Sequence, residues 1–292
     1  MNSRRISSTS NTIVKEAARL KRKRHRYQGR LFLVEGEDLL DAALGCGVVP
    51  RQVFVLEGYE DLLSGECAEH LLTTRSTPQK APPDIYICGQ AVMEKLSDLG
   101  SGSRVIAVFE MLDRKFPAGL DVPVAGSVKI DAAEGGVSSG PLLYLAGTGD
   151  PGNVGTMMRS AMAMGVSAIV MGPQTADPYS AKSLRATMGA IFQLPVYLTV
   201  NPDRLVSWAE HEKIPVVCAD AHAGVPVWEA GLAGAFVLVM GSEREGIPHR
   251  LSDAAVETVH IPQREETESI NVAMAGTVIL YEAFRQRSAQ NG

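Results

Sequence analysis

The chain has 292 residues, of which 45% are hydrophobic and 21% are charged, and this is the composition of an ordinary globular protein. Its formal net charge of −5 does not by itself indicate a nucleic-acid partner. No uncharged apolar run approaches the roughly 18 residues of a membrane span, and the N-terminus lacks the apolar centre of a signal peptide. We therefore expect a cytoplasmic protein with no membrane partner.

The cysteines give no sign of a metal site or of a disulfide framework. The chain contains four, Cys46, Cys67, Cys88 and Cys218, and they are scattered without a CxxC pair. Zinc sites and disulfide scaffolds require closer or more regular spacing. We expect no bound metal and a reducing environment.

The first 30 residues are strongly basic although the chain as a whole is mildly acidic. Ten of them are lysine or arginine, and only Glu16 is acidic. Such a block attracts phosphates and releases counterions when it meets RNA or DNA. A solvated helix end is the alternative interpretation. The candidate RNA-binding residues are those of the densest run, Lys21, Arg22, Lys23, Arg24 and Arg26.

Residues 1–110 alternate between helical and extended patterns, and they predict one small α/β unit. The predicted helices cover residues 12–24, 37–44, 60–72 and 90–99. The predicted strands cover residues 30–36, 51–58, 83–89 and 103–111. Residues 111–139 are rich in Gly, Pro and Ser and carry no sustained period, which predicts a linker.

A second α/β unit is predicted over residues 140–292. Short apolar runs of this kind are typical of a parallel sheet covered on both faces. The predicted strands are residues 142–147, 167–172, 194–200, 215–220, 236–241 and 258–262. A closing helix is predicted over residues 269–287.

A GxGxxG spacing at residues 147–152 first suggests a dinucleotide-binding oxidoreductase. Its surroundings contradict that interpretation, because Pro151 removes a backbone NH from the loop and the next strand has no acid at its tip for a ribose hydroxyl. Asn153 is instead predicted as the N-cap of a helix that runs to about Met164 and stops at Gly165.

Three separated blocks then point to one family. "DPGNVGTMMRSA" (150–161), "VMGSEREGIP" (239–248) and "IPQREETESINVAMAGTVILYEA" (261–283) resemble, in order and spacing, the three motifs of the SpoU or TrmH family of RNA ribose 2′-O-methyltransferases, in the SPOUT superfamily. The resemblance covers about residues 140 to 287 and includes residues 182–196. Residues 6–44 resemble the L30e-like RNA-binding domain that often precedes this catalytic domain.

The resemblance implies a fold with two α/β domains. A C-terminal SPOUT domain, residues 140–292, would form a deep trefoil knot, a rare exception among protein chains, around a mostly parallel sheet. A small L30e-like α/β/α domain, residues 1–110, would precede it, with the linker between them.

The resemblance also implies S-adenosylmethionine as the methyl donor. The residues that it places at the donor are Met240, Gly241, Ser242, Gly246, Ile261, Pro262, Ser269, Ile270, Met188 and Gly189. This chain departs from the family at Glu265, where many relatives have glycine, and at Ser242, where asparagine is common.

For catalysis the resemblance implies Asn153, Arg159, Glu243, Ser269 and Asn271. Methyl transfer to a ribose needs an aligned hydroxyl oxygen that loses its proton while negative charge on it is stabilised. Because a guanidinium is nearly always protonated, Arg159 suits phosphate binding and alkoxide stabilisation better than general-base work. The proton acceptor stays open at this point.

We therefore expect an S-adenosylmethionine-dependent ribose 2′-O-methyltransferase of structured RNA, with 23S ribosomal RNA favoured by the accessory domain. A tRNA ribose methyltransferase and a nonenzymatic RNA-binding protein with the same fold are the alternatives. The resemblance further implies a homodimer that pairs the first-motif helix and the closing helix. The apolar residues expected at its interface are Met157, Ala161, Met164, Val278, Leu280 and Tyr281.

Overall fold

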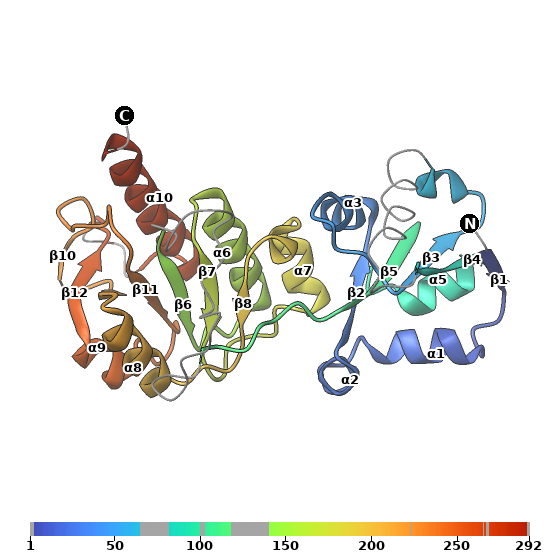
Figure 1. The fold of residues 1–292 in the computed structure, drawn as a ribbon, viewed down its shortest axis with the longest axis horizontal. Helices are drawn as coiled ribbons and strands as arrows, with labels where there is room; N and C mark the ends of the chain where they lie inside the picture. Colours follow the sequence, from blue (N-terminus) through green and yellow to red (C-terminus); the bar gives the residue numbers. More distant parts are fainter. Residues whose placement is uncertain are drawn as a thin grey trace. The chain divides into compact units, whose positions relative to one another are not determined.

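The computed structural model describes residues 3–64, 82–99, 103–117, 140–222, 224–264, 266 and 269–290. The chain divides into two compact units, which are drawn in Figure 1. The first unit contains Met1–Met111 together with Tyr179–Phe192, and the second contains Leu112–Pro178 together with Gln193–Gly292. The chain therefore passes between the units more than once.

The first unit is built on a mixed five-stranded sheet. Its strands, in spatial order, are β1 (Ser3–Ile6), β4 (Asp84–Cys88), β3 (Gln52–Leu56), β5 (Val105–Glu110) and β2 (Leu31–Glu35). Strands β1, β4 and β3 run parallel, whereas β5 is antiparallel to both β3 and β2. The sequence predicted every strand of this sheet except β1.

Helices cover both faces of this sheet. They are α1 (Thr12–Arg19), α2 (Lys23–Gly29), α3 (Glu37–Gly45), the 3₁₀ turn η1 (Glu60–Leu63), α5 (Gln90–Leu96), α7 (Ala181–Thr187) and the 3₁₀ turn η3 (Ala190–Phe192). Val14 of α1 and Val92 of α5 share a core with Phe54 and Tyr86 of the sheet. Only the start of the helix predicted over residues 60–72 is described, as η1, because residues 65–81 lie outside the described part of the chain.

The helix predicted over residues 12–24 is interrupted. Asn11 caps its start by accepting a hydrogen bond from the Ile13 amide at 2.9 Å, as expected. The helix ends at Arg19, and Arg22 has an extended backbone before α2 begins. The buried guanidinium of Arg26 donates to the carbonyls of Leu20 and Lys21, each at 2.8 Å. These bonds satisfy carbonyls that a continuous helix would have paired internally.

Residues 179–192 pack into the first unit although they follow the first motif of the methyltransferase region. The ring of Tyr179 lies 4.7 Å from that of Phe32, and the ring of Phe192 lies 5.4 Å from that of Phe109. Gly189 has a φ of 89°, and a Cβ built on it would come 2.5 Å from the Cβ of Ala42. The domain boundaries predicted from the sequence did not include this arrangement.

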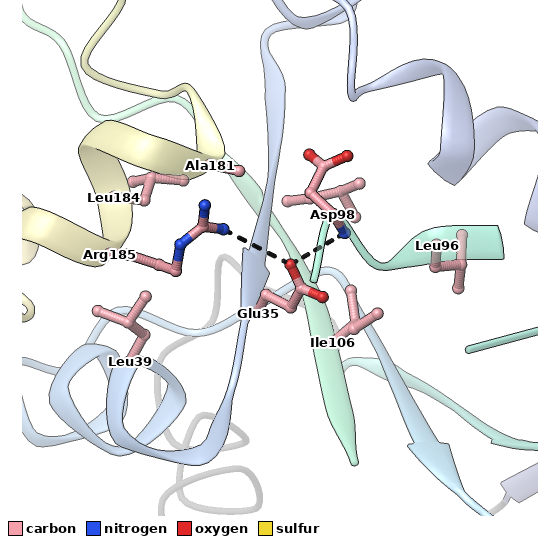
Figure 2. A pocket seen from close by; sticks show the side chains of 9 residues that line it. Glu35, Leu39, Leu96, Asp98, Ile106, Ala181, Leu184 and Arg185 are labelled. Carbon is pink, nitrogen blue, oxygen red and sulfur yellow. Dashed lines mark hydrogen bonds and ion pairs between the residues drawn. The ribbon is translucent and has the colours of Figure 1, made fainter. Parts of the chain in front are cut away.

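A carboxylate on β2 connects this segment to the rest of the unit. Glu35 lies 4.0 Å from Arg185 of α7, and it accepts hydrogen bonds from the Asp98 amide at 3.2 Å and from the hydroxyl of Ser97. Figure 2 shows Glu35 between Arg185 and Asp98. Only 9% of the Glu35 side chain is exposed, so these partners must compensate for the water that the carboxylate loses on burial.

The second unit is an all-parallel seven-stranded sheet. Its strands, in spatial order, are β10 (Val225–Pro226), β12 (Ala255–His260), β9 (Val216–Ala219), β11 (Val237–Gly241), β6 (Leu142–Ala146), β7 (Ala168–Met171) and β8 (Val196–Tyr197). All residues of β6 are buried, as expected for the centre of a sheet covered on both faces. The mostly parallel sheet predicted for this region is confirmed.

The helices described in the second unit flank this sheet. They are α6 (Pro151–Ala163), α8 (Pro202–Glu212), α9 (His249–Asp253) and α10 (Val272–Gln290). Leu205 of α8 and Leu251 of α9 share a core with Tyr144. Helix α10 packs against α6 and β11, as Figure 1 shows. Among the described helices, none combines the length and the apolar character that crossing a bilayer would need.

Asp150, not Asn153, is the N-cap of α6. Its carboxylate accepts a hydrogen bond from the Asn153 amide at 3.0 Å, and Pro151 occupies the first turn, where a missing NH has no cost. The predicted cap was therefore wrong by three residues, because an aspartate directly before proline competes for the same role. Gly165, with a φ of 67°, ends the helix as predicted.

Part of the apolar surface expected at a dimer interface lies inside the second unit. Met157, Ala161 and Leu280 are fully buried. Met157 lies where α10 crosses α6, since its Sδ is 3.4 Å from a Cβ built on Gly276. The expectation for these three residues was wrong, because helical periodicity does not show which of two apolar stripes the chain itself covers.

We expect Glu35→Ala to loosen residues 179–192. The change leaves the Arg185 guanidinium without its carboxylate and the Asp98 amide without its acceptor, at a cost of about 1–3 kcal/mol. Hydrogen exchange should accelerate in α7, and the thermal midpoint should fall. Glu37→Ala is the matched control, because its partner Arg104 is largely exposed and such pairs contribute about 0–1 kcal/mol. Equal exchange rates in α7 for both variants would contradict this role.

Candidate active site

A pocket of about 600 Å³ opens in the second unit, within the range of small-molecule sites. It lies where β9, β11 and β12 end and α10 begins. In an open parallel sheet the carboxyl ends of the strands are where ligands bind. The residues of the predicted donor site that line it are Met240, Gly241, Ser242, Gly246, Ile261, Ser269 and Ile270.

The loop after β11 closes on itself at one side of this pocket. The amide of Ser242 donates to the Gly246 carbonyl, and the amide of Gly246 donates to the Ser242 carbonyl, both at 3.1 Å. A Cβ built on Gly241 would lie 2.6 Å from the carbonyl carbon of Gly246, and Gly246 has a φ of 66°. Both positions therefore suit glycine, for close approach in one case and for backbone conformation in the other.

A chain of side-chain hydrogen bonds joins the three sequence motifs. The amide of Asn271 donates to Asn153 Oδ1 at 3.1 Å, and the amide of Asn153 donates to Glu243 Oε1 at 2.8 Å. The Oδ1 of Asn271 also caps α10 by accepting from the amides of Ala273 at 2.9 Å and Met274 at 3.3 Å. Three residues predicted as catalytic from separate parts of the sequence thus form one network, and its carboxylate belongs to the pocket wall.

The other two residues predicted as catalytic lie outside this network. Arg159 is exposed on α6, and no hydrogen bond or ion pair joins it to another residue of the described chain. Six residues along an α-helix correspond to about 240° of rotation, so Arg159 leaves the helix in a different direction from Asn153. Ser269 is exposed and lines the pocket.

Three of the ten residues predicted at the donor do not line this pocket. Pro262 is exposed next to the lining residue Ile261. Met188 and Gly189 belong to the first unit, where both have positive φ and Gly189 packs on Ala42. Their proposed contact with a donor stays a prediction. Glu265 lies outside the described residues.

The basic block of the first unit contains two kinds of residue. Lys21 donates to the carbonyl of Ser97 at 2.5 Å and lies 3.6 Å from Asp98, while Arg26 is buried with its guanidinium on two carbonyls. These contacts give both residues a structural role. Arg22, Lys23 and Arg24 are exposed. Among the five candidate RNA-binding residues, they are the ones whose charge faces solvent.

The sequence interpretation missed several polar residues of the pocket, namely Asp220, His222 and Gln263. Asp220 follows β9 and Gln263 follows β12. Polar residues that follow buried parallel strands gather at one edge of the sheet, but which strand ends lie together becomes clear only from the strand order.

Thiol chemistry is not a property of this site. Cys218 immediately precedes the lining residues after β9, but burial, aided by the nearby charge of Asp220, raises the pKa of its thiol to about 12. A thiol with such a pKa carries almost no thiolate near neutral pH, so Cys218 is not a nucleophile.

Comparison with known protein families gives a match for each of the two regions of the chain. Residues 141–281 match the SpoU rRNA Methylase family, and residues 11–107 match the MRM3-like substrate binding domain. The chain is 27% identical over 282 residues to the 23S rRNA (guanosine(2553)-2'-O)-methyltransferase RlmP of Bacillus subtilis, covering 95% of this chain and 98% of that protein. It is 29% identical over 290 residues to the 23S rRNA (uridine(2479)-2'-O)-methyltransferase of Streptomyces viridochromogenes, covering 97% and 93%.

Solved structures match over nearly the same length. The AdoMet-bound rRNA methyltransferase of Sinorhizobium meliloti has a TM-score of 0.78 at 27% identity and covers 97% of this chain and 98% of its own. The SpoU methyltransferase AviRb of Streptomyces viridochromogenes, in complex with AdoMet, has a TM-score of 0.76 at 26% identity, with coverages of 96% and 99%. With the three motifs joined at one pocket, these matches identify residues 141–281 as a SpoU rRNA methylase region and residues 11–107 as an MRM3-like substrate binding domain that precedes it.

Proposed function

We propose that this protein transfers a methyl group from S-adenosylmethionine to the 2′-hydroxyl of a ribose in 23S ribosomal RNA. The observation that carries the proposal is the network Asn271–Asn153–Glu243 at the wall of a pocket of about 600 Å³. The names of the two relatives that match over nearly the whole chain, both 23S rRNA 2'-O-methyltransferases, support the reaction and the class of substrate.

The pocket fits the donor in size and in lining. Its wall combines apolar side chains such as Ile261 and Ile279 with the polar Gln263, whose Oε1 is buried without a hydrogen-bond partner among the described residues. When bound, S-adenosylmethionine supplies an electrophilic methyl group on a sulfonium. The residues that would hold it are the backbone of the loop from Met240 to Gly246 and the segment Ser269–Ile270.

The network orients a carboxylate for the ribose. Asn271 is fixed by its cap on α10 and in turn fixes the carbonyl end of the Asn153 amide, so the NH₂ end points at Glu243. Glu243 is thereby held as a hydrogen-bond acceptor at the pocket wall. A carboxylate placed there can align the ribose hydroxyl and accept its proton as the oxygen attacks. Asn153 and Asn271 act through Glu243 and are positioning residues.

Arg159 has the separate task of binding phosphate. Its side chain offers five NH donors in a planar fork and is exposed without a protein partner in the described chain. A phosphate next to the target ribose would pair with it, and the same charge would stabilise the negative charge that develops on the ribose oxygen as its hydroxyl loses the proton. Ser269, exposed at the pocket, is proposed to contact the substrate.

We propose that the enzyme is a homodimer that pairs through α10. Met274, Val278, Tyr281 and Phe284 repeat at three- or four-residue intervals along this helix and are 64%, 41%, 55% and 41% exposed. Such a stripe on a helix is apolar surface that the described part of the chain leaves exposed. A second copy of the same helix is self-complementary to it, as a twofold interface requires.

The knotted fold is part of the same proposal. Strand β11 lies between β9 and β6 in the sheet, and α10 packs against α6 and β11 after the chain has formed β12 on the far side of β9. This return of the chain end to the centre of the unit supports a passage of the C-terminal segment through an earlier loop.

Arg159→Ala is expected to lower the rate of methyl transfer by roughly a hundred- to a thousandfold, because one stabilising contact to the developing charge is lost. Affinity for S-adenosylmethionine should stay within a few-fold by calorimetry. Arg250→Ala, another exposed arginine of the second unit, is the matched control and should turn over normally. Near-normal turnover of the Arg159 variant on its true substrate would exclude this role.

Val278→Asp is expected to produce a monomer, because it buries a charge in the proposed interface. Light scattering at micromolar concentration should give twice the chain mass of 31.2 kDa for the wild type and the single mass for the variant. Val256→Asp, at an exposed valine outside the stripe, should leave the mass unchanged. A fully active monomeric wild type would contradict the dimer.

Replacing Arg22, Lys23 and Arg24 together by alanine should weaken RNA binding and leave donor affinity unchanged. Each lost phosphate contact should reduce the log–log salt slope of binding by roughly 0.7–0.9. Arg51→Ala is the control, because Arg51 is exposed in the same unit but paired with Glu110. If the salt slope of the triple variant equals that of the control, this block is only solvated charge.

A further inference from the structure

Gln263 is a polar residue of the pocket that the catalytic network does not use. It follows β12 and lines the pocket, and its Oε1 is buried without a hydrogen-bond donor among the described residues. A buried acceptor that finds no partner costs free energy, and a folded protein retains such a group where a ligand supplies the missing donor. The terminal torsion of glutamine is soft, so the amide can turn toward a ligand at little cost.

The position of Gln263 in the sheet separates it from the reacting groups. Glu243 follows β11, whereas Gln263 follows β12, and β9 lies between these strands. Neighbouring strands are spaced by about 4.8 Å, so the two strand ends are roughly 10 Å apart across the sheet. A ligand whose methyl group faces Glu243 therefore reaches Gln263 with a part remote from the reaction.

The chemistry around Gln263 suits a flat, neutral ring with an amine on its edge. Ile261 and Ile279 supply apolar surface in the same lining, and the glutamine amide offers one acceptor and one donor side by side. Glutamine pairs in this way with the 6-amino group and the adjacent ring nitrogen of adenine. An ammonium group would be better matched by the carboxylate of Asp220, which also lines the pocket.

We propose that Gln263 recognises the adenine of the methyl donor, with its Oε1 accepting a hydrogen bond from the 6-amino group. Gln263 is then a positioning residue that sets donor specificity. This inference rests on the proposed donor, S-adenosylmethionine.

Calorimetry with two stable donor analogues tests the proposal on the full-length protein. S-adenosylhomocysteine carries the 6-amino group, and S-inosylhomocysteine carries an oxygen in its place. The wild type should bind the adenosyl compound at least about tenfold more tightly. Gln263→Met, which has similar volume but no amide, should bind the two compounds equally. Gln263→Glu, which keeps an acceptor, should retain a preference for the adenosyl compound.

Thermal unfolding separates recognition from a structural role. Without ligand, Gln263→Met should melt at or above the wild-type temperature, because it removes a buried acceptor that has no partner among the described residues. A marked loss of stability in that variant would mean that Gln263 holds the loop, and would overturn the proposal.

The remaining outcomes are also decisive. If Gln263→Met keeps the wild-type preference, the inference is wrong and the proposed donor stands. If that variant loses affinity for S-adenosylhomocysteine but not for methylthioadenosine, which lacks the amino-acid part, Gln263 contacts the amino acid and the adenine assignment is wrong. If the wild type binds neither homocysteine compound, the proposed donor fails and the inference fails with it.

Discussion

The contact between α6 and α10 is the constraint on which the site depends. The helices meet through Met157 and Gly276, and a hydrogen bond of 2.7 Å links the hydroxyls of Ser160 and Thr277. This packing brings the start of α6 beside the start of α10, although more than a hundred residues separate them in the chain. Asn153 and Asn271 can pair only because of that alignment, and Glu243 is held in turn by Asn153.

Much of this site could be predicted from the sequence, because its residues occur in three blocks of specific composition. Asn153, Glu243 and Asn271 were placed together by family resemblance, and their hydrogen bonds agree with that grouping. Gln263 and Asp220 were missed because a single polar residue after a strand carries no spacing signal of its own. Their position becomes meaningful only once the strand order is known.

The errors in the predicted fold have local physical causes. The helix predicted over residues 12–24 is interrupted because the buried Arg26 pairs with backbone carbonyls, which a pattern of basic residues cannot reveal. The cap of α6 was misplaced because Asp150 and Asn153 are both good capping residues. The packing of Tyr179 and Phe192 in the first unit was not predicted. The residue type indicates that an aromatic ring will be buried, but it does not indicate which residues the ring will contact.

The placement of residues 179–192 has a consequence for dissecting the protein. A fragment that ends at Met111 would lack the rings that cover Phe32 and Phe109, so it would expose an aromatic surface that the complete chain buries. Conversely, a fragment that begins at Gly140 would carry Tyr179 and Phe192 without their partners Phe32 and Phe109. Each unit is therefore made of two separate segments of the chain. Neither unit corresponds to one continuous stretch of sequence that could be expressed alone with its core complete.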